Sequence, residues 1–153
     1  MTAGERYLAI ATGFLAPNPH EPAFEINAYA EGFKLDDAAN AHLRVVHASP
    51  DAPSVDVGTE QSGRLTAVVA RGLSFGQATP ASGLSLPAAS LSIGVAPTGV
   101  RQVVAAFGLT TQGGERAFAI AAGALDAHRG VGFRIIAVDT TSSPWQAASV
   151  LPR

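Results

Sequence analysis

The chain has 153 residues, a length typical of one globular domain, of which 47% are hydrophobic and only 14% charged. Its net charge is −2, its nine arginines and single lysine (Lys34) are scattered, and it contains no cysteine. This composition excludes disulfides, thiolate metal sites and cysteine nucleophiles, and it argues against a nucleic-acid partner, which would need a basic patch.

The expected secondary structure is entirely β. Sixteen glycines and ten prolines interrupt the chain every few residues, and the segments between them are short and rich in Val, Ile, Leu and Phe. Many short strands separated by turn residues are typical of a sandwich or a barrel. In chain order, the expected strands are 5–13, 23–30, 42–48, 54–58, 64–70, 73–77, 88–96, 101–108, 115–124, 131–138 and 146–150.

The first forty residues contain two segments that need separate interpretation. Residues 7–16 are apolar and have the length of a signal-peptide core, but Glu5 and Arg6 precede them and no cleavage site of small residues follows. Residues 34–41 are interpreted as a polar linker or a single helical turn. Every apolar run is far shorter than the roughly 20 residues of a spanning helix, so membrane insertion is not expected.

An internal repeat links the start of the chain to its second half. The segment Gly4–Gly13 matches Gly114–Gly123 at seven of ten positions, with an offset of 110 residues. Phe24–Ala28 corresponds more loosely to Phe133–Ala137. An offset close to one domain length indicates tandem domains and not a solenoid, whose period is about 20–50 residues. Residues 1–33 are therefore expected to be a partial repeat, namely the last two strands of a preceding domain copy.

The most distinctive run extends from Leu43 to Val57 and is expected to form a strand, a corner and a second strand. Its prolines fix the backbone and remove two hydrogen-bond donors, while its Ser and Asp side chains can bind nearby amides. Two interpretations of the histidine stay open: a strand-end residue bonded to the corner backbone, or a metal or ligand site with both aspartates. The residues of this structural corner motif are His47, Ser49, Pro50, Asp51, Pro53 and Asp56.

This run closely resembles the opening motif of the bacterial family named domain of unknown function 4397, in which a strand leads into His-Ala-Ser-Pro-Asp-Ala-Pro and a Val-Asp-Val strand. Residues 84–88 and 114–123 also fit the family pattern, whereas the segment 58–63 departs from it. The resemblance implies an immunoglobulin-like antiparallel β-sandwich over residues 42–139, with 140–153 as a C-terminal tail. It also implies an exported or cell-surface location and carries no established activity.

The remaining candidate residues give weaker signals. His20 and His128 lie in expected loops, and His42 and His47 stand five apart, on opposite faces of one strand. Trp145 is expected either to cap the open end of the sandwich or to be exposed. No catalytic, cofactor-binding or metal-ligating residue is predicted, because no nucleophile elbow, phosphate loop or calcium loop is present.

Two hypotheses of function follow. The first is a non-catalytic structural or adhesion module in a tandem array, and the second is a ligand-binding module, for example for a glycan, that uses loops at one end of the sandwich. An enzyme is a distant third. The N-terminal strands would expose apolar side chains unless they fold back onto the sandwich, pair with a second chain or propagate a filament. Of these outcomes we favour the homodimer.

Overall fold

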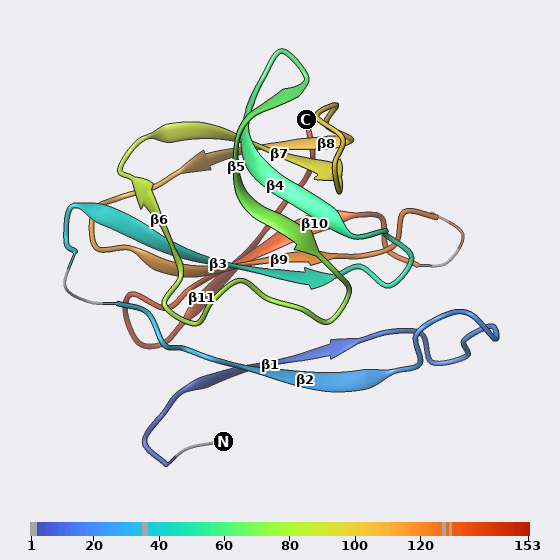
Figure 1. Ribbon diagram of the computed structural model, residues 1–153. Helices are drawn as coiled ribbons and strands as arrows, with labels where there is room; N and C mark the ends of the chain where they lie inside the picture. Colours follow the sequence, from blue (N-terminus) through green and yellow to red (C-terminus); the bar gives the residue numbers. More distant parts are fainter. Residues whose placement is uncertain (1–2, 35–36, 127, 129) are drawn as a thin grey trace.

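The computed structural model describes residues 3–34, 37–126, 128 and 130–153, and its regular elements are all strands (Figure 1). In chain order the strands are β1 (Tyr7–Thr12), β2 (Glu25–Ala30), β3 (Asn40–Ala48), β4 (Val55–Gln61), β5 (Arg64–Leu73), β6 (Leu84–Pro87), β7 (Ser90–Pro97), β8 (Ala105–Thr110), β9 (Arg116–Ala122), β10 (Arg134–Asp139) and β11 (Gln146–Val150). The predicted all-β sandwich is confirmed.

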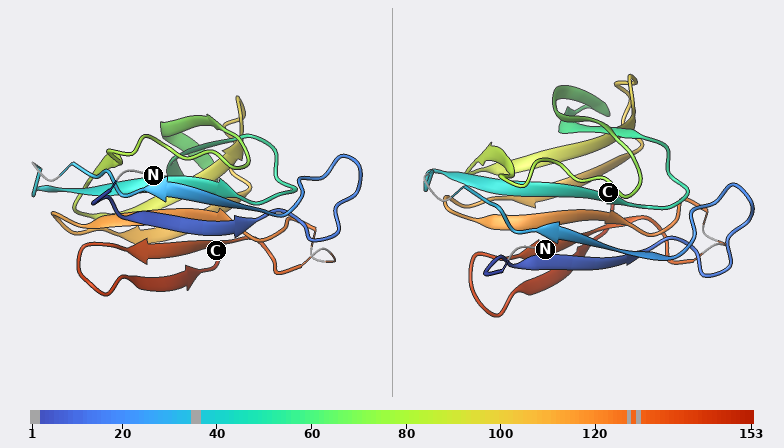
Figure 2. Two further views of the ribbon diagram at one scale, coloured as in Figure 1. Left: turned by 90° about the horizontal axis from the view of Figure 1, so that it is seen from below. Right: turned by 60° about the horizontal axis from the view of Figure 1, so that its bottom comes forward.

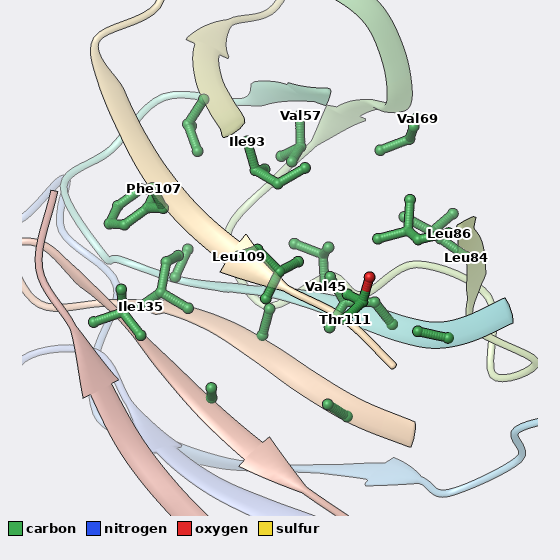
Figure 3. Close-up of a pocket in the computed structure, with 18 of the residues that line it drawn as sticks. Val45, Val57, Val69, Leu84, Leu86, Ile93, Phe107, Leu109, Thr111 and Ile135 are labelled. Carbon is green, nitrogen blue, oxygen red and sulfur yellow. The ribbon is translucent and has the colours of Figure 1, made fainter. Parts of the chain in front are cut away.

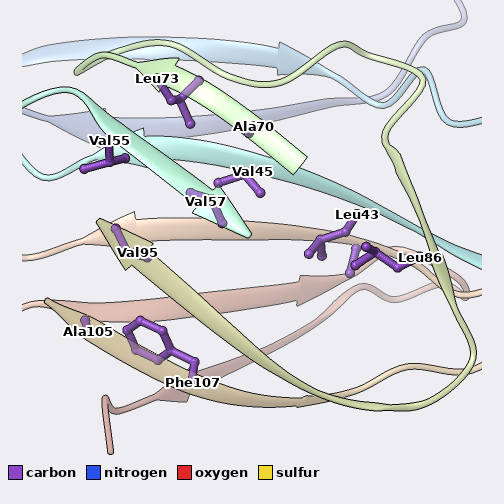
Figure 4. Packing of buried hydrophobic residues seen from close by; sticks show 11 residues of the cluster. Leu43, Val45, Val55, Val57, Ala70, Leu73, Leu86, Val95, Ala105 and Phe107 are labelled. Atoms are coloured by element: carbon purple, nitrogen blue, oxygen red, sulfur yellow. The ribbon is translucent and has the colours of Figure 1, made fainter. Parts of the chain in front are cut away.

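Two sheets form the sandwich. One has the strand order β11-β10-β9-β3-β6 and the other β5-β4-β7-β8. Alternate residues of each strand point between the sheets, as period-two strands require. Figure 4 shows Val45 of β3, Val57 of β4, Val95 of β7 and Phe107 of β8 meeting in this interior. The core is therefore built from both sheets.

The larger sheet is mixed, which corrects the expectation of purely antiparallel pairing. β3 and β9 run parallel, in register from His42↔Arg116 to Ala48↔Ala122, and the other ladders between named strands are antiparallel. A parallel pair needs a long crossover, here the whole of β4 to β8. The third and the ninth strand of the chain are thus neighbours in one sheet.

The hairpin β1–β2 forms a third layer. It is a separate two-stranded sheet that lies against the outer face of the larger sheet (Figures 1 and 2). A second apolar cluster fills the space between them, with Tyr29 from β2 and Phe118 from β9 at its centre. The hairpin therefore packs face-on and does not lengthen either sheet of the sandwich.

Several expected boundaries differ from the structure, among them the strand expected at 101–108, which is β8 at Ala105–Thr110. Of the strand expected at 73–77, Leu73 is the last residue of β5 and the rest is a turn, because the Gln77 N–H donates to the Ser74 carbonyl and Gly76 has φ +77°. Leu84–Pro87 is instead the strand that pairs with β3. The expected strand 146–150 is present as β11 and pairs with β10 along its whole length, so residues 140–153 are part of the larger sheet and not a tail outside it.

The segment between the hairpin and the sandwich is short. Asn40 and Ala41 of the expected linker 34–41 already belong to β3, while Leu35 and Asp36 lie outside the described residues. In the part of the chain that is described, no helix has the length and apolar character that a bilayer crossing requires.

Candidate functional site

The corner motif joins the end of β3 to the start of β4, and His47 is buried within it at 1% exposure. Its Nε2 lies 3.0 Å from the Pro53 carbonyl oxygen. Because a carbonyl oxygen can only accept, Nε2 is the donor in this bond. Nδ1 has no hydrogen-bond partner among the described residues. The ring thus ties the last residues of β3 to the proline corner.

Two further motif residues fasten the connection between β9 and β10. The fully buried Ser49 donates its hydroxyl hydrogen to the Gly123 carbonyl at 2.7 Å. The Asp51 carboxylate accepts the backbone N–H groups of Leu125 and Asp126, both at 2.9 Å. Since these partners lie more than 70 residues further along the chain, the corner holds distant loops together.

Asp56 binds the end of β5 and the β7–β8 connection at the same end of the sandwich. Because it lies between Val55 and Val57, which belong to the core, its side chain is on the opposite face of β4, where it is only 4% exposed. Its carboxylate accepts hydrogen bonds from Gly72 N–H at 2.8 Å and Gly99 N–H at 3.1 Å. The Gly72 bond is the main reason why the pKa of Asp56 is lowered; the Gly99 bond and the Arg71 charge add to it and burial opposes it.

The open alternative, a metal or ligand site at His47, Asp51 and Asp56, gains no support from this geometry. Both carboxylates already accept two backbone hydrogen bonds each. The described residues hold no group of three or more His, Asp or Glu side chains with the proximity that a metal ion needs. The corner contains a turn over residues 49–52, in which the Ala52 N–H donates to the Ser49 carbonyl at 3.4 Å. Pro50 lies inside this turn and Pro53 follows it directly.

Apolar space lies beside the corner. A narrow cavity of about 100 Å³ runs between the two sheets and is lined by aliphatic side chains such as Val45, Leu86 and Ile93 (Figure 3). A second cavity of about 260 Å³ lies at the corner-motif end, lined by residues at the ends of β7, β8, β9 and β10. Val104 and Leu125 line it and are 67% and 53% exposed. The sequence did not single out this apolar end, because single aliphatic residues in loops carry no motif.

Arg44 is a second residue that sequence reasoning missed. It points from β3 toward the hairpin, where its guanidinium donates to the Ala30 and Thr79 carbonyls and lies over the rings of Tyr29 and Phe118. Burial lowers the pKa of its guanidinium. A cation at the centre of the second apolar cluster is satisfied by carbonyls and ring faces, and it attaches the hairpin to the sandwich.

The other aromatic and histidine candidates are dispersed. Trp145 packs in the second apolar cluster, 6.5 Å from the Phe118 ring, so it neither caps the end of the sandwich nor stands free. His42 is buried on β3 facing away from His47, while His20 and His128 are exposed in loops. The structure therefore brings no second histidine to the corner.

The fold and the corner define a β-sandwich domain whose first two strands are joined by a proline-rich, backbone-binding turn. The family described as Domain of unknown function (DUF4397) matches residues 41–151, and the chain belongs to this family. No curated protein and no solved structure matches the chain. The matched region begins in β3 and ends just after β11, so it coincides with the sandwich and leaves the β1–β2 hairpin outside.

Proposed function

We propose that this chain is a non-catalytic structural or adhesion-type module, exported or held at the bacterial surface as the family resemblance implies. The observation that supports this proposal is the use of the corner motif. Its His, Ser and Asp side chains each bind backbone groups, and these bonds fix the connections that meet at one end of the sandwich. The polar and ionisable side chains of the corner motif thus form bonds that stabilise the fold.

The proposal is tested by comparing stability with ligand response in the same variants. Under a structural role, Ser49→Ala and Asp51→Asn lower the melting temperature, and the wild type gives no turnover in a broad hydrolase screen and no signal on a glycan array. The opposite result would be turnover or saturable glycan binding that Asp51→Asn abolishes at an unchanged melting temperature. That result would assign the corner to an active or binding site.

The second candidate function, a ligand-binding module, is favoured by the apolar cavity at the corner-motif end. An apolar ligand suits it better than a glycan, since Tyr29 and Trp145, which could stack on sugars, are packed in the second cluster. Isotope-labelled protein titrated with octanoate, with maltose as the polar control, distinguishes the two. Saturable shifts confined to Val104, Leu125 and Phe133 would support the apolar ligand, and no shifts would support the structural role alone.

Self-association through the N-terminal strands stays a prediction. Its motivation is the exposed apolar surface of the hairpin region, where Leu15, Phe24 and Ile26 are 88%, 47% and 68% exposed. Large apolar side chains that gather at the surface mark interaction sites when they form one patch.

A further inference from the structure

The hairpin β1–β2 repeats the hairpin β9–β10 residue for residue. β1 pairs with β2 from Tyr7↔Ala30 to Thr12↔Glu25, and β9 pairs with β10 from Ala117↔Asp139 to Ala122↔Arg134. Adding 110 to each β1 residue and 109 to each β2 residue converts the first set of partners into the second. The repeat seen in sequence is therefore a repeat of register.

The ends of the two hairpins are closed in the same way. The Phe14 N–H donates to the Pro22 carbonyl at 3.0 Å, and the Ala124 N–H donates to the Val131 carbonyl at 2.9 Å. At the other end, Glu31 N–H donates to Arg6 and Thr140 N–H donates to Arg116, both at 2.8 Å. These pairs obey the same two offsets, so the paired strands and the bonds that close both ends of the hairpin are duplicated.

The inner faces of the two hairpins meet each other. Leu8 and Ile10 of β1 correspond to Phe118 and Ile120 of β9, and all four belong to the second apolar cluster. The two equivalent sheets are thus stacked back to back through the same face. This contact uses one face of β1–β2 and leaves the opposite face outside.

The opposite faces have different surroundings. In β9–β10, Ala119, Ala121, Ile135 and Ala137 line the space between the two sheets of the sandwich. Their counterparts in β1–β2 are Ala9, Ala11, Ile26 and Ala28, and these are exposed. Three alanines around one isoleucine form a flat apolar surface, which in the second copy is covered by the four-stranded sheet.

The edges of β1 and β9 that face away from their hairpin partners also have different neighbours. β9 pairs on one side with β10 and on the other with β3, in parallel. Within the described residues, β1 pairs with β2 alone, so the edge that corresponds to the β3-binding edge of β9 carries no strand. An unpaired edge beside an apolar face accepts strand addition.

We propose that the outer face and free edge of β1–β2 dock the β3-to-β8 half of another domain of this family, completing a second sandwich back to back with the first. The incoming β3-type strand would pair parallel to β1, and the incoming four-stranded sheet would cover Ala9, Ala11 and Ile26. The internal copy defines this occupant, because residues 40–110 perform both tasks for β9–β10. The inference deepens the proposed structural role and rests on it for the choice of a family partner.

The test adds a second β3-to-β8 half to the same chain. A second copy of residues 40–113 is fused in front of Gly4, which reproduces the native junction between Gly113 and Gly114 and leaves residues 4–153 intact. We expect the β1 amides on the edge away from β2 to gain strong protection from hydrogen exchange. Unchanged exchange in β1, with the added segment unprotected, would overturn the proposal.

A charged substitution on the docking face makes the test specific. In the fusion protein, Ile26→Asp should lower the melting transition of the added sandwich by about 10 °C, because a carboxylate would be buried there. In the unfused chain it should shift melting by about 1–2 °C, since Ile26 is 68% exposed. Val104→Asp, at an equally exposed position (67%) away from the hairpin, is the matched control and should leave the added sandwich unaffected. Equal effects of Ile26→Asp in both proteins would contradict docking on this face.

Two further measurements test the proposal if the fusion protein is insoluble or if a second copy of the chain occupies the outer face. A synthetic peptide of residues 40–53, titrated onto the labelled full chain, should give saturable shifts confined to β1, and their absence would count against the proposal. If light scattering shows that the unfused chain is a dimer and Ile26→Asp makes it a monomer, the outer face binds an intact second chain, in which β3 is already paired with β9. That result would overturn the proposal in favour of the homodimer. Turnover or glycan binding would refute the structural role without changing any of these readouts.

Discussion

The guanidinium of Arg44 in β3 lies over the ring of Tyr29 in β2, with its central carbon 5.7 Å from the ring centre. The same group donates to the Ala30 and Thr79 carbonyls, so one side chain connects the hairpin, the larger sheet and the loop that precedes β6. The Tyr29 hydroxyl in turn donates to the Gly76 carbonyl at 2.9 Å. The hairpin is thus attached by polar bonds as well as by apolar packing.

Replacing Arg44 by Met should loosen this attachment. Met keeps the aliphatic stem but leaves two carbonyls without their charged donor, and hydrogen bonds to charged groups contribute about 2 kcal/mol each. We expect the free energy of unfolding to fall by about 2–3 kcal/mol and hydrogen exchange in β1–β2 to quicken first. Arg64→Met, at an exposed arginine, is the control and should change stability by less than about 0.5 kcal/mol. Equal losses in both variants would refute the attachment role.

Replacing His47 by Ala should destabilise the sandwich. The variant loses the bond to the Pro53 carbonyl and leaves space beside both cavities, so we expect a loss of about 2 kcal/mol in denaturant unfolding. The exposed His20→Ala serves as the control. If His47→Ala instead melts normally and loses bound metal in elemental analysis, the corner is a metal site.

Asp56 should make the free energy of unfolding depend on pH in acidic solution. Its pKa in the folded chain is lowered, so its contribution is fully present above the unfolded pKa of about 4 and disappears as the pH falls through the folded value. We expect Asp56→Asn to be less stable than the wild type at pH 7, and the difference to shrink as the pH falls below about 4. Unfolding curves of both proteins across this range provide the measurement, and a difference independent of pH would contradict the assignment.

Gly13 and Gly4 offer a matched pair of glycine substitutions. Both have positive φ, +84° and +86°, but a Cβ at Gly13 would collide with the Ala23 carbonyl oxygen, whereas a Cβ at Gly4 meets nothing within 4 Å. Gly4→Ala should cost about 1 kcal/mol for the left-handed backbone, and Gly13→Ala at least about 2 kcal/mol. Thermal unfolding compares the two, and similar losses would show that the hairpin turn adjusts freely.

Most strands and the repeat could be predicted from the sequence because their signals are local. Alternation along β9 separates Phe118 and Ile120 from the alanines between them, and the match of 4–13 with 114–123 predicts the same strand twice. Such patterns predict which face of a strand is buried, but they do not predict which element packs against that face. The sequence therefore left the hairpin's position open among three outcomes, and tertiary packing placed it on the face of the chain's own sandwich.

The remaining differences arise where long-range contacts decide. β6 is only four residues long and forms because the first residues of β3 offer it an edge to pair with. The segment after Leu73 is apolar enough for a strand, yet Gly76 and the bond from Gln77 to Ser74 turn it back toward His47. The parallel pairing of β3 with β9 has no local signal, since it depends on residues about 74 positions apart.

The pairing of β3 with β9 limits the order in which the strands can assemble during folding. β3 lies between β9 and the edge strand β6 in the larger sheet, but β9, with which it pairs along most of its length, is made only after β4 to β8 have been synthesised. On a ribosome, which adds about 5–20 residues per second, the apolar β3 must wait several seconds for that partner. Closing so distant a contact is also slow in entropic terms. The antiparallel pairs whose strands are neighbours in sequence, such as β1–β2, β4–β5, β7–β8 and β9–β10, are the units able to form early. The larger sheet is completed only when β9 pairs with β3.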